Sequence, residues 1–290
     1  MTAHNPLKAG AYMMGAVVSF TSMAVAGREM AHELDTFEIM TYRSFIGIAV
    51  VLMIAGLAGT LGQVTRRHMG LHVIRNASHF LGQNLWFYAL TLITLPQLFA
   101  FEFSVPLWVA LLAPFILNER LTRTRALAAG LGFAGILIVA RPDQIGFSIG
   151  IIAAAISALG FTGSAIATKL LTRTESTTCI LFWLTILQAI FGIICAGFDG
   201  DIAWPSLSTW PWVVLVGLAG LLAHFCITSA LQIAPAVIVF PFDFLRLPLA
   251  TAVGIMFYAE PFEVSVIVGA FVIISANVIN LRTEAKPAQA

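Results

Sequence analysis

The sequence contains little charge. Only 10% of its 290 residues are charged, 59% are hydrophobic, and the mean hydropathy is +0.94. Because about a quarter of the residues of a soluble domain are charged, this composition excludes an ordinary soluble protein. It indicates a polytopic membrane protein whose main partner is the lipid bilayer. The net charge of +1 offers no basic face to neutralise phosphates, which excludes a nucleic-acid partner.

Cysteine and catalytic motifs are equally scarce. The three cysteines, Cys179, Cys195 and Cys226, all lie in apolar runs. Their spacing fits neither a disulfide framework nor a metal site, so we expect small apolar fillers and no bound metal. The glycines at 130–135 lie in an apolar run, which indicates helix packing or a dimer contact rather than a nucleotide loop. We therefore expect no cofactor, no ATP-driven pump and no enzyme, but a monomer or weak homodimer.

Apolar runs of membrane length are abundant. A transmembrane helix needs about 17–25 apolar residues. Ten such runs are present, at residues 7–27, 37–58, 70–90, 95–117, 124–140, 147–169, 177–198, 209–230, 234–257 and 262–281. They predict an all-α membrane protein with ten transmembrane helices.

Lysine and arginine are distributed unevenly between the connections. If the amino terminus is cytoplasmic, ten of the 15 fall inside and two, Arg28 and Arg141, fall outside. Because cytoplasmic loops carry an excess of positive residues, we predict a multi-pass protein of the inner membrane with both termini cytoplasmic. The remaining three, Arg43, Arg75 and Arg246, lie within predicted helices.

The two halves of the chain repeat each other. A shift of 141 residues places residues 20–26 over 161–167, residues 101–103 over 242–244, and Glu119 over Glu260. We predict two repeats, 1–141 and 142–290, with five helices each. An odd number of helices inserts the second repeat with the opposite topology, and inverted repeats are the architecture of alternating access.

An acidic residue lies in the matching apolar run of each repeat, Glu102 in the first and Asp243 in the second. A carboxylate at this depth costs roughly 2.5–3.5 kcal/mol on insertion scales. Each run also carries three prolines, which kink a helix because proline lacks a backbone donor. Two such interrupted helices at corresponding places typically mark the central site of a transporter.

The end of each half carries a further pattern, in residues 117–142 and 258–282, where a glutamate (Glu119, Glu260) follows the fourth helix and an arginine (Arg141, Arg282) ends the fifth. With the five-plus-five organisation, this resembles the EamA-type branch of the drug/metabolite transporter superfamily over nearly the whole chain. Within that branch the sequence is most similar to the YddG-type exporters of aromatic and other neutral amino acids. The resemblance implies a basket of helices in which helices 1, 3, 4, 6, 8 and 9 line a central cavity, and it favours export.

The fourth helix places Phe99, Glu102 and Phe103 on one face. We predict that they form a cavity wall in which Glu102 meets the amino group of a substrate or a coupling proton. The structural alternative is an ion pair of Glu102 with one of the three arginines that lie within helices.

Asp243 has a potential partner of its own, because Arg246 lies three residues further on the same helical face. We predict a structural or gating ion pair. Alternatively, if both side chains face a hydrated cavity, Arg246 binds a substrate carboxylate through two hydrogen bonds.

Polar residues follow one face of the third helix, among them His79 and Gln83, and the 141-residue shift places His224 over Gln83. Because histidine titrates near neutral pH, we predict that these residues recognise substrate or couple protons. The alternative is a hydrogen bond to a neighbouring helix. Phe161 of the sixth helix is predicted to add an aromatic wall.

These features predict a secondary transporter that exports small metabolites by alternating access. A cavity rich in phenylalanine and poor in charge suits partly apolar zwitterions, so neutral and aromatic amino acids are the first choice. The alternative is efflux of cationic drugs or polyamines, coupled to protons through Glu102. An intramembrane enzyme that uses His79, His224 and Glu102 lacks a catalytic spacing, and a passive channel has no need of inverted repeats with kinked helices.

Overall fold

The structure is a computed structural model that describes residues 6–116, 123–141, 148–198, 200–233 and 242–284. Its helices are α1 (Pro6–Met30), α2 (Thr36–Leu57), the 3-10 helix η1 (Leu61–Gln63), α3 (Met69–Leu90), α4 (Leu95–Glu102), α5 (Val105–Ile116), α6 (Arg123–Ala140), α8 (Ile149–Leu171), α9 (Thr177–Ala196), α10 (Trp210–Ile233), α12 (Arg246–Tyr258) and α13 (Val264–Glu284). With α4 and α5 taken as one interrupted span, they occupy all ten predicted segments, which confirms the all-α, ten-helix fold.

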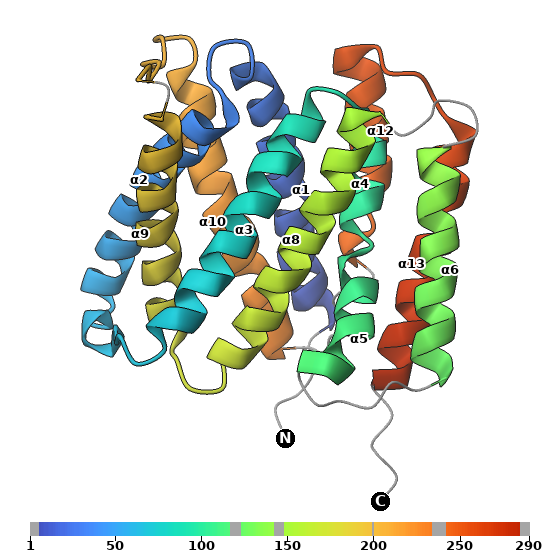
Figure 1. Cartoon of the computed structure of the whole chain (residues 1–290), viewed down its shortest axis with the longest axis horizontal. Helices are drawn as coiled ribbons and strands as arrows, with labels where there is room; N and C mark the ends of the chain where they lie inside the picture. Colours follow the sequence, from blue (N-terminus) through green and yellow to red (C-terminus); the bar gives the residue numbers. More distant parts are fainter. Residues whose placement is uncertain (1–5, 117–122, 142–147, 199, 234–241, 285–290) are drawn as a thin grey trace, which may run out of the picture.

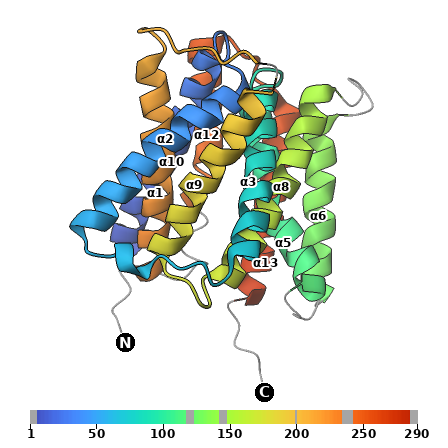
Figure 2. The same cartoon turned by 60° about the vertical axis from the view of Figure 1, so that its left-hand side comes forward.

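The helices of the two halves are interleaved. Figure 1 shows α2 and α9 at one side, α6 and α13 at the other, and the remaining helices between them. The most closely packed pairs are α3 with α8, α1 with α10, α6 with α13, and α2 with α9, and each pair joins the two halves. The third helix of one half thus packs against the first helix of the other, twice. This is the arrangement expected of inverted repeats, and α1 accordingly begins on the face where α13 ends (Figures 1 and 2).

Glycines allow two of these pairs to approach closely. A Cβ atom added to Gly160 of α8 would lie 2.7 Å from the Cα of Gly82 in α3. In the same way, a Cβ atom on Gly135 of α6 would lie 2.8 Å from the carbonyl oxygen of Gly269 in α13. Small residues at such crossings let the backbones pack directly. Gly135 therefore serves packing within the chain, not a dimer contact.

The capping of helix N-termini also recurs in the two halves. Asp35 caps α2 in a capping box with Glu38, and the Ser176 hydroxyl accepts a hydrogen bond from the Cys179 N–H at the start of α9. Such caps satisfy N–H groups that have no partner within the helix. The two cap residues are 141 positions apart, the same shift as in the sequence repeat.

The fourth span differs from the single kinked helix that its prolines predict. It is interrupted, because the chain turns at Phe103–Ser104 between α4 and α5, and a matching turn at Phe244–Leu245 precedes α12. A proline follows each turn within four residues, where it removes a hydrogen-bond donor and crowds the preceding carbonyl. The side-chain amide of Asn277 in α13 donates to the Phe103 carbonyl at 2.7 Å, so the interruption is supported by another helix. Residues 234–241 of the predicted ninth helix, and Glu119, lie outside the described residues.

Candidate functional site

The two interruptions meet at a cluster of three charged side chains. The Arg246 guanidinium lies 2.6 Å from the Asp243 carboxylate and 2.8 Å from the Glu102 carboxylate. Its side chain is 3% exposed, and each carboxylate is 19% exposed. The indole N–H of Trp86 donates to the second oxygen of Glu102 at 3.0 Å. The sequence proposes three arginines as partners of Glu102, and the structure selects Arg246.

Aromatic rings surround this cluster. The Arg246 guanidinium lies over the rings of Phe20, Phe99 and Phe103, at 4.7, 5.0 and 5.2 Å from their centres. Phe103 also contacts Phe244, its counterpart in the other repeat, with ring centres 5.3 Å apart. A cation over an aromatic face is stabilised by the negative face of the ring. The cluster thus combines charge with closely packed aromatic rings, of which Phe99 and Phe103 are buried.

Asp243 retains an acceptor within the cluster. Its Oδ1 is buried and has no hydrogen-bond partner among the residues that the structure describes, while Oδ2 binds Arg246. The three side chains together carry a formal charge of −1. A substrate ammonium group would complete both the hydrogen bond and the charge balance.

A second group of buried polar side chains lies on α3, α9 and α10. His79 and Gln83 are 7% and 5% exposed, and His79 Nδ1 and Gln83 Nε2 have no hydrogen-bond partner within the described part of the chain. The His79 ring lies 5.8 Å from Phe161, and the His224 ring lies 6.1 Å from Phe20. Sequence reasoning singled out Phe161 but missed Phe20, although the 141-residue shift relates the two.

A small cavity of about 30 Å³ lies between α2, α9 and α10. Its lining includes Arg43, Ser44, Thr185, Gln188 and His224. This space suits a few water molecules or one small polar group. A whole metabolite therefore reaches these residues only when the helices separate.

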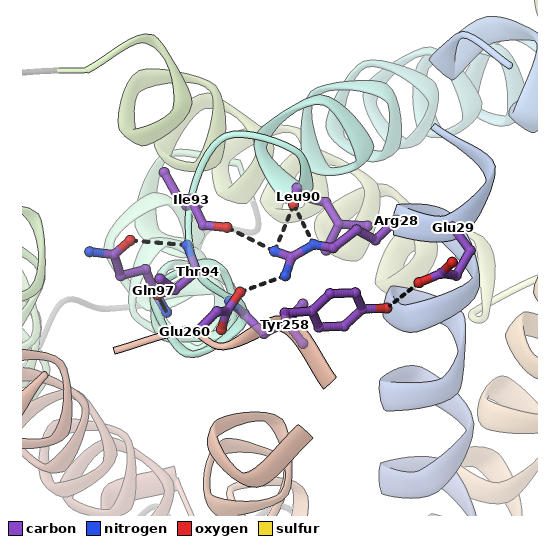
Figure 3. A network of polar contacts seen from close by, with 9 residues as sticks. Arg28, Glu29, Leu90, Ile93, Thr94, Gln97, Tyr258 and Glu260 are labelled. Atoms are coloured by element: carbon purple, nitrogen blue, oxygen red, sulfur yellow. Dashed lines mark hydrogen bonds and ion pairs between the residues drawn. The ribbon is translucent and has the colours of Figure 1, made fainter. Parts of the chain in front are cut away.

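A larger cavity of about 660 Å³ opens at the face opposite to the start of α1, at the ends of α1, α3 and α12. Pockets for small organic ligands span about 300–1,000 Å³. Arg28 lies in its wall, where it donates to the carbonyls of Leu90 and Ile93 and pairs with Glu260 at 2.5 Å (Figure 3). Glu260 also accepts from the Leu95 N–H at 3.1 Å. Arg28 and Glu260 thus hold together α1, the end of α3 and the start of α4.

One trio of potential metal ligands is present among the described residues. The ligand atoms of His72, Glu175 and Cys179 all lie within 4.8 Å of one another. Glu175 and Cys179 also contact Thr65, whose hydroxyl donates to Glu175 at 2.8 Å and whose N–H donates to the Cys179 sulfur at 3.4 Å. We assign the trio to anchoring residue 65 against α9. Cys179 is therefore not the apolar filler that its sequence context predicts.

The fold defines the class of protein, a multi-pass membrane protein built from inverted repeats around charged, interrupted helices. The EamA-like transporter family model matches residues 7–141 and 148–282. The chain belongs to the EamA-like transporter family, within the drug/metabolite transporter superfamily, as the sequence resemblance predicts. The closer similarity to YddG-type exporters stays a prediction.

Several curated relatives are transporters of metabolites. The chain is 32% identical to a riboflavin transporter of Brucella anthropi, over 75% of this chain and 78% of the relative. It is 26% identical to an S-adenosylmethionine uptake transporter of Rickettsia bellii, over 93% and 92%. It is 23% identical to the pseudopaline exporter CntI of Pseudomonas aeruginosa, over 96% and 98%. A crystal structure with 20% identity shares the fold with a TM-score of 0.67, over 96% of this chain and 99% of the other. These relatives indicate a membrane transporter of small metabolites, with a transport role in place of an enzymatic one.

Proposed function

We propose that this protein is a secondary transporter that exports small, partly aromatic zwitterions by alternating access, with neutral and aromatic amino acids as the simplest members. The observation that carries the proposal is the Glu102–Arg246–Asp243 cluster. It lies among phenylalanine rings where the interrupted helices of both repeats meet. Charged groups within a membrane typically mark a substrate or ion pathway.

The contacts suit a molecule with a charged and an apolar end. The buried Oδ1 of Asp243 has no hydrogen-bond partner among the described residues and would accept from an ammonium group, and the rings of Phe20, Phe99 and Phe103 lie around Arg246 beside it. The relatives named for riboflavin and S-adenosylmethionine support a carrier for metabolites that contain a ring system. The relatives include both an uptake transporter and an exporter, so transport in each direction belongs in the test.

The geometry does not favour cation efflux through Glu102. That hypothesis needs Glu102 as a counter-charge for the drug or polyamine, yet both of its carboxylate oxygens are already engaged, one by Arg246 and the other by Trp86. We propose a multi-pass protein of the inner membrane with both termini cytoplasmic. We also propose that one chain is the transport unit, since the residues of the cluster come from both halves of a single chain.

The test uses the purified protein in liposomes. Exchange of labelled phenylalanine, methionine, threonine and lysine would be followed with and without a pH gradient, beside riboflavin and S-adenosylmethionine. We expect exchange of neutral and aromatic amino acids, with strong loss in His79→Ala and Phe103→Ala. Phe271→Ala is the matched control, because Phe271 is 69% exposed on α13. If the protein transports an organic cation in a Glu102-dependent way and exchanges no amino acid, the proposal is refuted in favour of cation efflux.

A further inference from the structure

Arg43 and Arg75, which lie within helices, differ in their partners from Arg28, Arg141 and Arg246. Arg28, Arg141 and Arg246 each pair with a carboxylate, at 2.5, 3.4 and 2.6 Å. Arg43 of α2 and Arg75 of α3 form no ion pair with any carboxylate among the described residues. A charge at membrane depth is unfavourable unless another charge or an aqueous cavity compensates it.

The contacts of Arg43 and Arg75 are with neutral groups. Arg75 donates to the Thr168 hydroxyl at 3.1 Å and to the Asn76 side-chain oxygen at 3.0 Å, and it is 6% exposed. Arg43 lies 3.7 Å from the sulfur of Met40 and lines the cavity of about 30 Å³. These partners orient the guanidinium groups but leave both positive charges uncompensated.

Further unsatisfied polar atoms lie around the same place. Gln188 lines the cavity with Arg43 and His224 and donates to the Asn76 carbonyl at 2.9 Å, and the Asn76 side chain in turn accepts from Arg75. His79 Nδ1, Gln83 Nε2 and Gln188 Oε1 are buried without a hydrogen-bond partner in the described chain, and their residues are 7%, 5% and 3% exposed. Buried polar groups are nearly always hydrogen-bonded in native structures. Several unsatisfied polar atoms beside two uncompensated cations therefore indicate a ligand-binding site.

The arginines also depart from the internal repeat. The scaffold residues recur after 141 positions, as with Glu102 and Asp243 or Phe103 and Phe244, whereas Arg43 corresponds to Leu184 and Arg75 to Val216. Arg246 departs from the repeat in the same way, since it corresponds to Val105. The three arginines within the helices thus belong to features that the chain carries in one half only. Gly220 of α10 makes room for this group, since a Cβ atom there would lie 3.3 Å from Arg43 Nη2.

We propose that Arg43 and Arg75 form an anion subsite that binds the carboxylate of the transported metabolite. The planar guanidinium matches a carboxylate through two parallel hydrogen bonds. The Phe20 ring contacts both His224, which lines the cavity with Arg43, and Arg246 of the acidic cluster. This assignment deepens the proposed function and depends on it for the identity of the metabolite.

The experiment compares phenylalanine with phenylalaninamide, which differs from it only at the carboxylate, and with two simple carboxylates. Thermal unfolding of the purified full-length protein would be followed with phenylalanine, phenylalaninamide, benzoate and acetate at constant ionic strength. We expect the carboxylates to raise the melting temperature of the wild type and the amide to have little effect. Arg43→Gln and Arg75→Gln should weaken carboxylate binding at least tenfold and lose the discrimination between acid and amide. Arg66→Gln is the control, because Arg66 is exposed outside the helices.

Two further measurements separate this role from a structural one. Without ligand, both glutamine variants should unfold at or above the temperature of the wild type, because each removes an uncompensated charge. Arg43→Lys and Arg75→Lys keep the positive charge but lose the planar guanidinium that forms two parallel hydrogen bonds, so these variants should bind carboxylates with intermediate affinity. Wild-type affinity for benzoate in the glutamine variants, or no response of the wild type to any carboxylate, would overturn the proposal.

The proposed transport function and the anion subsite can be refuted independently of each other. If liposomes exchange a neutral metabolite such as riboflavin while carboxylates have no effect, the anion subsite is refuted and transport stands. If acetate protects the wild type through Arg43 and Arg75 but no metabolite is exchanged, the subsite stands and the transport function is refuted.

Discussion

Arg246 is the position where removal of one side chain should have the largest effect on stability. Arg246→Met would leave the Glu102 and Asp243 carboxylates, each 19% exposed, facing each other without their shared cation. Removing one partner of a buried ion pair costs about 3–5 kcal/mol, because the remaining charge stays buried without compensation. At roughly 2 °C of melting temperature per kcal/mol for a chain of this size, we expect unfolding about 6–10 °C below the wild type.

The electrostatic cause can be isolated by neutralising the whole cluster. In the triple variant Arg246→Met, Glu102→Gln, Asp243→Asn, no charge remains to be buried, so most of the lost stability should return. Thermal unfolding in one detergent at one protein concentration would compare the wild type, the single variant and the triple variant. If Arg246→Met unfolds within 1 °C of the wild type, the ion pairs do not stabilise the fold. If the triple variant is no more stable than the single one, the loss comes from packing against the phenylalanine rings instead of from charge.

Three other consequences can be measured in the same way. Gly160→Val should lower the free energy of unfolding by about 1–3 kcal/mol, because a Cβ atom meets Gly82 at 2.7 Å and overpacking carries a cost of this size. Gly130→Ala is its control, since a Cβ atom there meets nothing within 4 Å. Equal effects of the two substitutions in thermal unfolding would contradict the close packing of α3 on α8. Glu260→Gln should lower the free energy of unfolding by about 2–4 kcal/mol, because it leaves Arg28 without its carboxylate and weakens the hydrogen bond from the Leu95 N–H. Amide hydrogen exchange should become faster at the start of α4, and unchanged protection there would refute the role of Glu260. Hydrogen bonds from the Thr209 hydroxyl and from Ser206 hold the pKa of Glu33, in the loop before α2, below its ordinary value. Its stabilising effect is thus present above the ordinary pKa of 4.5 and is lost as the pH falls through the lowered pKa, so wild type and Glu33→Gln should differ in melting temperature at neutral pH and converge in acid.

Much of the fold follows from features that are local in the sequence. Apolar runs predict the spans because backbone groups in lipid must be satisfied within a helix. The 141-residue shift then relates the cap at Asp35 to the cap at Ser176, and the turn at Phe103 to the turn at Phe244. Prolines mark the fourth span as irregular, although they predict a kink where the structure has a full interruption. The difference arises because Asn277, on a helix far along the chain, satisfies the carbonyl that the interruption frees.

The partners of the charged groups could not be derived in this way. Glu102 had three candidate arginines, and the one it binds is 144 residues away, selected by the rotation and crossing of helices from both halves. The same holds for the trio of His72, Glu175 and Cys179, which a sequence with three scattered cysteines does not suggest. An unpaired charge is even less visible in a sequence, because every carboxylate is a potential partner until the helices are placed. Composition and periodicity thus determine which residues enter the membrane and in what order. Only the packing of the helices decides that Arg246 pairs with two carboxylates while Arg43 and Arg75 have no carboxylate partner among the described residues, since ion pairing depends on separations of a few ångströms between distant parts of the chain.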